Sequence, residues 1–418
     1  MYRITPHLYD QIRHFAAFPQ TGVSLQQMVQ FGSTPSDGTL FKASQFLGDE
    51  LPIRLAHRVK ELEELPDRLN EMPSIQKVKL WYAQSFEELV TLPKPTLSAD
   101  LRQLIAKAGN GNAIPEAKPN PSLIPDLRNG KYHNGRTSVP VSNRHDIPFP
   151  PEISAYNEKF TKTLSIIKRR HDAVVATIAQ GILEYKKSRQ RSQIDSSIQS
   201  FLDRFYMSRI GIRMLIGQHI ALTTEPPRTD YVGIICTRTN IRQLCSEAIE
   251  NARFICEDYY GLYESPRVQL VCDPDLSFMY VPGHLSHMTF EIMKNSLRAV
   301  VEKHGINASS FPLIKVVVAK GNEDITVKIS DEGGGIPRSA MPLVWTYMYT
   351  TAHEQDLAAD FDKSDFKAPM AGFGYGLPIS RLYARYFGGD LILISMEGYG
   401  TDVYLHLNRL SSSSEPLA

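Results

Sequence analysis

The most informative group in this sequence is a set of four polar side chains at helical spacing: Glu291, Lys294, Asn295 and Arg298. An i, i+3, i+4, i+7 pattern places its members on one face of a helix, with the apolar residues between them turned toward a core. That face would offer a carboxylate, an ammonium, an amide and a guanidinium together. Such a set is suited to hold a metal ion and a polyphosphate, although a solvated amphipathic helix standing alone would show the same spacing.

Two glycine-rich segments follow this helix in the chain. The first, Asp331–Gly335, comes directly after an alternating run that predicts a strand, and the second, Gly372–Pro378, precedes an apolar stripe that predicts a helix. Asp331 can accept a hydrogen bond from the exocyclic amine of an adenine, while Gly333 and Gly335 let the backbone approach the base without a Cβ clash. Backbone N–H groups at the start of the later helix would bind phosphate. The sequence therefore predicts an adenine nucleotide site.

Asn295 is the candidate ligand for the Mg²⁺ expected with such a nucleotide, because Mg²⁺ prefers oxygen ligands and keeps water and phosphate oxygens around it. The sequence contains no Gly-x-x-x-x-Gly-Lys-Ser/Thr loop, which excludes a P-loop enzyme. The glycine loop, catalytic Asp loop and Asp-Phe-Gly of ordinary protein kinases are missing as well. Residues 341–371, which mix aromatic, acidic and small side chains, are expected to order over the nucleotide.

The composition is that of a globular protein with more than one domain. The chain has 418 residues, of which 42% are hydrophobic and 22% charged. Lysine and arginine total 46 against 45 acidic residues, so the net charge of +1 does not favour a nucleic-acid binder. No apolar run reaches membrane-spanning length, and four scattered cysteines without CxxC spacing indicate buried reduced thiols.

Periodicity divides the chain into a helical N-terminal domain at 1–225 and a mixed sheet-and-helix domain at 226–410. Residues 93–151, rich in Pro, Gly, Asn and Ser, predict a disordered insertion in the first domain. The serine-rich end at 411–418 predicts a mobile tail. The expected fold class is α+β.

The helices of the N-terminal domain can be placed approximately. Pro52 lies just before an apolar helical pattern and predicts a helix that begins near that position. Two long amphipathic helices are expected at 156–187 and 194–218.

The order of the motifs resembles the ATP-binding domain shared by histidine kinases, type II topoisomerases, Hsp90 chaperones and MutL repair proteins (the GHKL superfamily). The Asn-bearing helix at 291–298, the Asp-x-Gly-x-Gly loop from Asp331, the glycine box Gly372–Leu377 and the late pair Gly400-Thr401 follow the order of that family. The resemblance implies an α/β sandwich that binds ATP and Mg²⁺. It implies these nucleotide contacts: Glu291, Asn295, Arg298, Asp331, Gly333, Gly335, Thr350, Thr351, Gly372, Phe373, Gly374, Tyr375, Gly376, Leu377 and Thr401.

A closer resemblance covers nearly the whole chain outside 93–151 and the tail. Leu51-Pro-Ile-Arg-Leu-Ala, Trp81-Tyr-Ala-Gln-Ser and Phe201-Leu-Asp-Arg-Phe-Tyr-Met-Ser-Arg-Ile are similar to segments of the mitochondrial pyruvate dehydrogenase kinases. The resemblance implies a four-helix bundle before the ATP domain and a location in the mitochondrial matrix. It implies ATP-dependent phosphorylation of a serine on the E1α subunit of the pyruvate dehydrogenase complex, which inactivates that complex. It also implies two further partners, the lipoyl domain of the E2 core and a second copy of the chain.

The resemblance assigns catalytic roles to four residues. Glu291 would be the general base that takes the proton of the substrate serine during γ-phosphoryl transfer, while Lys294 and Arg298 would stabilise phosphate charge. His171, in Lys-Arg-Arg-His-Asp, matches a histidine that the family places against this glutamate. Two other interpretations of His171 stay open: an ordinary polar residue of a bundle helix, or the phosphoacceptor of a histidine kinase, although a His-Glu-x-x-x-Pro box is absent.

Two regulatory sites also follow from the resemblance. A pocket for pyruvate-like carboxylates would comprise Tyr82, Ser85, Lys168, Arg209 and Arg213. Lys168 stands where the family usually has arginine, so bidentate binding of a carboxylate at that position is lost. A pocket for the lipoyl group would comprise Met28, Phe31 and Phe46. Both sets are also compatible with ordinary core residues.

Two other functions remain open. A kinase of the branched-chain 2-oxoacid dehydrogenase shares these motifs, although the run from Gly374 through Tyr383 favours the pyruvate branch. A scaffold that binds ATP and a lipoyl domain without phosphate transfer is less favoured, because Glu291 and Asn295 are intact. The tryptophans are Trp81 and Trp345, so the Asp-Trp tail pair of the animal enzymes is absent and a dimer is expected to form through the sheet of the ATP domain.

Overall fold

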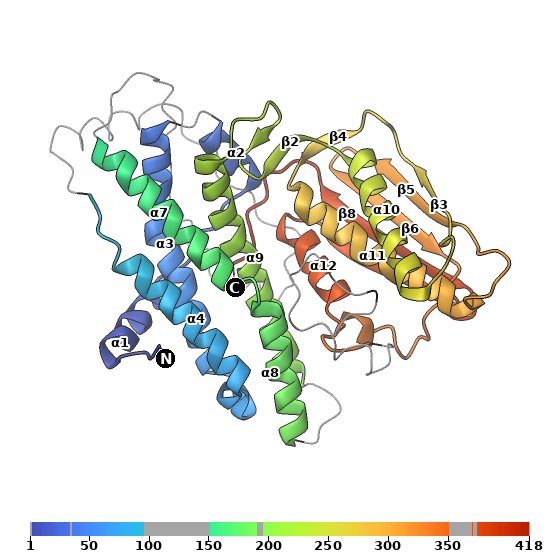
Figure 1. The fold of residues 1–418 in the computed structure, drawn as a ribbon, viewed down its shortest axis with the longest axis horizontal. Helices are drawn as coiled ribbons and strands as arrows, with labels where there is room; N and C mark the ends of the chain where they lie inside the picture. The colour runs from blue at the N-terminus through green and yellow to red at the C-terminus, as the bar shows by residue number, and fades with distance from the viewer. Residues whose placement is uncertain are drawn as a thin grey trace. The chain divides into compact units, whose positions relative to one another are not determined.

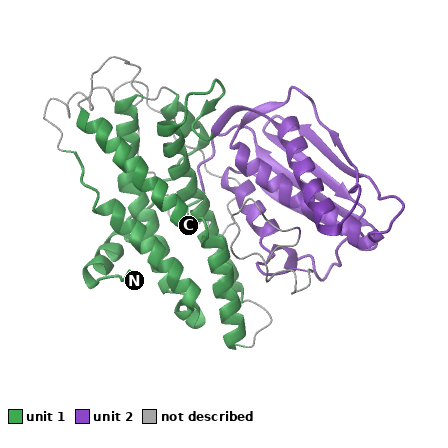
Figure 2. Cartoon of the chain, in the orientation of Figure 1, with its two compact units in different colours: residues 1–118, 125–234, 416–418 green, residues 119–124, 235–415 purple. Residues whose placement is uncertain are grey.

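The computed structural model describes residues 2–33, 36–95, 151–189, 195–350, 370 and 374–417. Almost all of the predicted insertion at 93–151 lies outside these residues, as do the nucleotide-site candidates Thr351, Gly372 and Phe373. The chain forms two compact units: unit 1 comprises 1–118, 125–234 and 416–418, and unit 2 comprises 119–124 and 235–415 (Figure 2). Among the described residues, no helix is both long and apolar enough to span a membrane.

Unit 1 is helical (Figure 1). Its described elements are α1 (Pro6–Phe15), α2 (Leu25–Gly32), α3 (Asp37–Glu63), η1 (Pro66–Glu71), α4 (Pro73–Val90), α7 (Pro151–Arg170), α8 (Val174–Arg189), α9 (Ser196–Thr224) and β1 (Tyr231–Val232). α3 packs against α4, α7 and α9, and α4 packs against α8. Burial of the apolar side chains on these helices, worth about 1.5–3 kcal/mol each, holds the bundle together. Fully buried examples are Leu55, Val59, Phe86, Leu164 and Phe205.

The start of α3 differs from the sequence expectation. The helix begins at Asp37 rather than near Pro52, because the Ser36 hydroxyl caps it and accepts a hydrogen bond from the Thr39 N–H at 3.3 Å. Pro52 therefore lies inside the helix, where its missing N–H leaves one helical hydrogen bond unmade. The pattern around Pro52 therefore predicted a helix that exists, but it placed the start of that helix too late in the chain.

Unit 2 combines a sheet with helices on one of its faces (Figure 1). Its described elements are β2 (Ile235–Asn240), α10 (Ile241–Tyr260), β3 (Val268–Val271), β4 (Ser277–Tyr280), α11 (Pro282–His304), β5 (Ile314–Lys320), β6 (Asp324–Asp331), η2 (Leu343–Trp345), α12 (Gly376–Tyr386), β7 (Asp390–Met396) and β8 (Gly400–Asn408). The five-stranded sheet has the order β3-β5-β6-β8-β7, parallel between β3 and β5 and antiparallel elsewhere. The predicted α+β class, a helical N-terminal region followed by a sheet domain, is confirmed.

The alternation of β6 decides which of its side chains face the helices. Ile325, Val327 and Ile329 are buried, whereas the residues between them are partly exposed. The same period of two brings Asp331, the last residue of the strand, onto the helix-covered face. The strand pattern thus carries an acidic side chain into the interior of unit 2.

Residues 411–415 are packed within unit 2, in contrast to the mobile tail expected for 411–418. Asn408 Nδ2 donates to the Ser413 hydroxyl at 2.8 Å, and the Ser411 hydroxyl donates to the Met279 carbonyl at 3.2 Å. The buried Tyr386 hydroxyl bonds the Glu415 carboxylate, which is itself buried. Partners supplied by α12, β4 and β8 therefore order a segment whose own composition predicts a solvated tail.

Candidate active site

Glu291 and Lys294 form an ion pair on α11. The Lys294 Nζ lies 2.9 Å from Glu291 Oε1, and Lys294 is only 3% exposed. The ammonium also lies 5.0 Å from the centre of the Phe290 ring. Lys294 therefore lies on the same face of α11 as Glu291, as its spacing predicts, although its side chain is buried.

The other two residues of the set remain accessible to different degrees. Asn295 is exposed, so its amide oxygen is available to a ligand. Arg298 Nε lies 2.8 Å from Glu302 Oε1, one turn further along α11. No group of three or more His, Cys, Asp or Glu side chains within the described ranges could hold a metal. A Mg²⁺ site would therefore depend on the Asn295 oxygen, with phosphate and water oxygens as its other ligands.

Asp331 lies at the end of β6, directly opposite Thr401 of β8. Its Oδ1 accepts a hydrogen bond from the Gly333 N–H at 3.0 Å, and the residue is 6% exposed. Burial raises the pKa of Asp331, and hydrogen bonds from Gly333, Ser296 and Thr401 only partly oppose that rise. The result is a buried acceptor surrounded by N–H and O–H donors.

The glycines after Asp331 are required by close contacts. A Cβ on Gly333 would lie 2.5 Å from Ala299 Cβ on α11. Gly335 has φ +69°, and a Cβ there would collide with the Met396 carbonyl oxygen. The Gly334 N–H also donates to the Tyr399 carbonyl at 3.0 Å. The loop is therefore held between α11 and the turn that joins β7 to β8.

The second glycine segment leads into α12, which begins at Gly376 beside Glu291. A Cβ on Gly376 would lie 2.5 Å from Glu291 Oε2, so a larger residue at this position would displace the Glu291 carboxylate. Leu377 follows in the first turn of α12. The Glu291 carboxylate thus lies beside the start of α12, whose first N–H groups can bind an anion, and Asp331 is joined to α11 through Ser296. Thr350 is the last described residue before the gap at 351–369.

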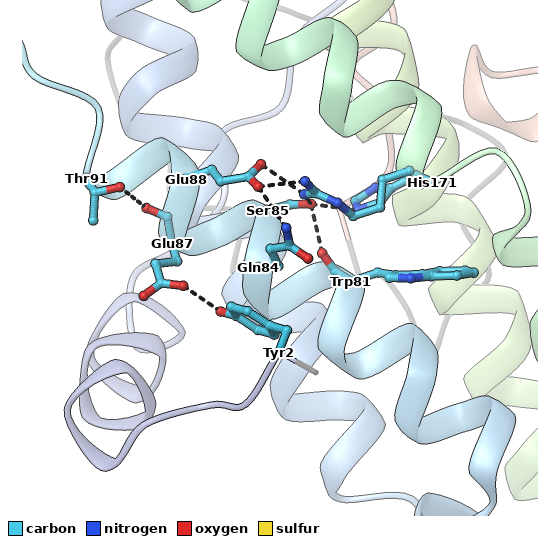
Figure 3. Close-up of polar contacts among 9 residues, drawn as sticks. Tyr2, Trp81, Gln84, Ser85, Glu87, Glu88, Thr91 and His171 are labelled. Carbon is cyan, nitrogen blue, oxygen red and sulfur yellow. Dashed lines mark hydrogen bonds and ion pairs between the residues drawn. The ribbon is translucent and has the colours of Figure 1, made fainter.

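His171 lies in unit 1, at the break between α7 and α8 (Figure 3). The single helix expected at 156–187 is therefore two helices with a turn at 171–173. His171 is 1% exposed, its ring stacks on Tyr82 with centroids 4.4 Å apart, and Nε2 lies 3.0 Å from the Ser85 hydroxyl. Burial, with help from the positive charge of Arg209, lowers the pKa of His171 to about 3. The imidazole is neutral at physiological pH.

The five candidates for a carboxylate pocket gather around this break. Arg209 donates to the carbonyls of His171 at 3.4 Å and Asp172 at 3.5 Å. Arg213 forms an ion pair with Asp172 at 2.8 Å and reaches the Lys168 carbonyl at 3.5 Å. Burial raises the pKa of Tyr82 to about 12, although the nearby arginines oppose it.

Sequence reasoning missed two members of this group. Arg170 makes two hydrogen bonds to the Glu88 carboxylate, at 2.6 and 2.9 Å, and a third to the Ser85 hydroxyl at 2.8 Å. Figure 3 shows Glu88 and Ser85 one turn apart on α4, with His171 beyond them. Arg170 directly precedes His171 in the chain, but nothing in the local pattern pointed to Glu88.

An apolar cavity in unit 1 brings the three lipoyl candidates together. Its lining residues come mostly from α2, α3 and α9: Gly22, Val23, Gln27, Met28, Phe31, Ala43, Phe46, Leu47, Leu215, Gln218, His219 and Leu222. His219 is held by a contact of 3.2 Å between its Nε2 and the Thr161 hydroxyl, and burial lowers its pKa to about 4. The cavity therefore presents an apolar wall with neutral polar groups.

Family models match both halves of the chain. The model described as mitochondrial branched-chain alpha-ketoacid dehydrogenase kinase matches residues 22–236. The model described as histidine kinase-, DNA gyrase B- and HSP90-like ATPase matches residues 280–411, which contain the helix with Asn295 and both glycine segments. The two matches correspond to the helical part and the sheet-containing part of the fold.

Whole-chain relatives agree with these models. A mitochondrial pyruvate dehydrogenase (acetyl-transferring) kinase of Schizosaccharomyces pombe is 51% identical over 98% of each chain. The corresponding kinase of Arabidopsis thaliana is 42% identical over 98% of this chain and 96% of its own. Isozyme 3 of Homo sapiens is 37% identical over 97% of this chain and 86% of its own. The chain therefore belongs to the family of the mitochondrial pyruvate dehydrogenase kinases.

Proposed function

We propose that this chain is an ATP-dependent protein-serine kinase of the mitochondrial matrix that phosphorylates the E1α subunit of the pyruvate dehydrogenase complex and thereby inactivates it. The family membership supports the activity, and the printed names of the relatives support the substrate complex and the mitochondrion. The observation that carries the proposal is the position of the Glu291 carboxylate, beside Lys294 and against the start of α12.

The geometry suggests how transfer proceeds. The N–H groups at the start of α12 bind the phosphates, while Asp331 accepts a hydrogen bond from the adenine amine. Asn295 would hold Mg²⁺, which would supply neutralisation of the phosphate charge. Glu291 takes the proton of the serine hydroxyl while the serine oxygen attacks the γ-phosphorus in line, the bond from that phosphorus to the β,γ-bridging oxygen breaks, and ADP leaves. The buried Lys294 keeps the Glu291 carboxylate oriented.

Incubation with ATP and each of two purified E1 components, from the pyruvate and the branched-chain complexes, tests the substrate. The pyruvate component is expected to incorporate phosphate on a serine. Preferred labelling of the branched-chain component would reverse the assignment, which the description of one family model also names. The same reactions report on histidine phosphorylation, since acid-labile phosphate on His171 would favour that alternative. Because His171 is 1% exposed, none is expected.

The apolar cavity is the proposed site for the lipoyl group of the E2 core. Phe31→Ala removes an aromatic wall of the cavity and is expected to weaken binding of an isolated lipoyl domain by about 10- to 30-fold, measured by titration calorimetry. Phe18→Ala is the matched control, because Phe18 is exposed and does not line the cavity. Equal losses in both variants would contradict the assignment.

The residues around His171 are the proposed site for an inhibitory pyruvate-like carboxylate. Arg209→Lys keeps the charge but loses the planar fork of donors, so the pyruvate concentration for half-inhibition is expected to rise at least about tenfold. Arg169→Lys, an exposed neighbour of the pocket, should leave inhibition unchanged. An unchanged pyruvate concentration for half-inhibition in Arg209→Lys would rule the site out.

The open face of the sheet supports the proposed homodimer. β7 is an edge strand, and its alternate residues Ile392, Ile394 and Met396 are 43%, 56% and 65% exposed. An apolar row of this kind on an edge strand is a usual feature of protein interfaces. A second copy of the same face would cover it.

A further inference from the structure

Residues 343–349 lie against Gly374, Tyr375 and Arg381. Three contacts join residues 343–349 to α12 and the residues before it: Trp345 with Arg381, Tyr347 with Tyr375, and Tyr349 with Gly374. The guanidinium carbon of Arg381 lies 4.5 Å from the centre of the Trp345 ring, and the two tyrosine rings are 5.2 Å apart. Gly374 has φ +78°, and a Cβ there would collide with the Tyr349 carbonyl oxygen.

The Arg381 guanidinium is oriented by Asp390, the first residue of β7. Its Nε and Nη2 lie 2.9 and 3.4 Å from the two carboxylate oxygens. Arg385, one turn further along α12, binds the same oxygens at 2.9 and 3.3 Å. The Leu391 N–H also donates to Asp390 at 2.8 Å, which fixes the carboxylate at the start of the strand.

The two arginines share Asp390 as a partner. Both attach α12 to Asp390, but Arg381 also lies over an indole. Arg385 alone would keep two hydrogen bonds to Asp390 and so preserve the connection between the helix and β7. The contact of Arg381 with Trp345 is thus not needed for that connection and serves residues 343–349.

We infer that Arg381 is a positioning residue for the nucleotide: held by Asp390, it fixes residues 343–349 through Trp345 against the backbone that binds the phosphates. The inference rests on the proposed function, because it requires ATP to bind at the start of α12. Arg381 touches neither the reacting atoms nor Glu291. Its loss should raise KM for ATP while leaving kcat within about twofold, since a looser 343–349 segment weakens nucleotide binding before chemistry begins.

The test compares Arg381→Met with Arg385→Met in the full chain. A cation–π contact of this kind is worth about 0.5–2 kcal/mol, so Arg381→Met should raise KM and the calorimetric Kd for ATP by about 2- to 30-fold. Arg385→Met should change either value less than twofold. Trp345→Leu should weaken ATP binding as much as Arg381→Met does, and Trp345→Phe should weaken it less. A variant that combines Arg381→Met with Trp345→Leu should bind ATP no more weakly than the weaker-binding of the two single variants.

Fluorescence provides a readout that does not depend on activity. Trp81 and Trp345 are the tryptophans of the chain, so Trp81→Phe leaves Trp345 as the one emitter. In that background Arg381→Met should change the emission of Trp345, and Arg385→Met should not.

The outcomes separate the two proposals. If Arg381→Met and Arg385→Met change the ATP affinity or the emission of Trp345 equally, the positioning role is wrong while the kinase assignment stands. If the unsubstituted chain does not bind ATP, both proposals fall.

Discussion

Glu291→Gln is expected to lower phosphate transfer to E1α by about 10²- to 10⁴-fold while ATP still binds, because a general base contributes about that factor to the rate. Glutamine keeps the shape of the side chain and an oxygen that can accept from Lys294 Nζ, now 2.9 Å from Glu291 Oε1. It cannot take a proton from the serine hydroxyl. Single-turnover transfer of labelled phosphate and calorimetric ATP affinity, measured on the same preparation, separate the chemical step from binding.

Glu250→Gln is the matched control for this change. Glu250 forms a similar i, i+3 pair with a basic residue, Arg253 at 3.3 Å, but on α10 rather than at the site. It should transfer phosphate at the unsubstituted rate. Glu291→Gln removes a carboxylate charge beside the buried Lys294, so a thermal melt of both variants checks that each is folded. Transfer by folded Glu291→Gln within tenfold of the unsubstituted rate would remove Glu291 from the role of base.

Local patterns foresaw the parts of the site that lie on single elements. The helical spacing of residues 291–298 predicted the helix that carries Glu291 and Asn295. The alternating run before Asp331 predicted β6, and the apolar stripe after Gly372–Pro378 predicted α12. Each of these inferences needs only the residues of one segment and its period. The collision that a Cβ would meet at Gly335 explains why this loop position is a glycine.

Local patterns failed where a distant element decides the outcome. Lys294 lies on the same face of α11 as Glu291, yet it is buried. The spacing of residues within one helix does not show what packs against that helix. The clamp of Arg170 on Glu88 joins positions 82 residues apart. Glu415 is ordered by Tyr386, although its own serine-rich surroundings predict a solvated tail. Such contacts depend on the tertiary structure and leave no trace in short-range periodicity.

Asp331→Asn should have opposite effects on binding and on stability. Asparagine turns an N–H group toward the adenine amine and leaves two donors facing each other, so ATP affinity is expected to fall at least about 100-fold. Burial raises the pKa of the native carboxyl, which means that the folded state binds the proton more tightly than the unfolded chain does. The ionised carboxylate therefore costs stability at neutral pH, and its replacement should leave the melting temperature unchanged or higher.

The raised pKa of Asp331 also predicts how ATP affinity and stability of the unsubstituted chain depend on pH. As pH falls toward the raised pKa of Asp331, the carboxylate gains a proton, ATP affinity falls, and the stability contributed by this group increases. As pH rises through that pKa the stability is lost again and the affinity returns. Asp331→Asn should show neither trend for this site. Calorimetric titrations and thermal melts over the acidic range measure both trends.

Asp324→Asn is the control at the other end of β6. Asp324 is the first residue of the strand, its side chain is half exposed, and it accepts from the Thr326 hydroxyl at 3.2 Å, so its loss should leave ATP affinity unchanged. An Asp331→Asn variant that binds ATP within twofold of the unsubstituted chain would show that the buried acceptor does not recognise adenine. A variant that loses both binding and stability would show instead that Asp331 is needed to hold the loop at Gly333–Gly335, because its hydrogen bond to the Gly333 N–H would then outweigh the cost of burying its charge.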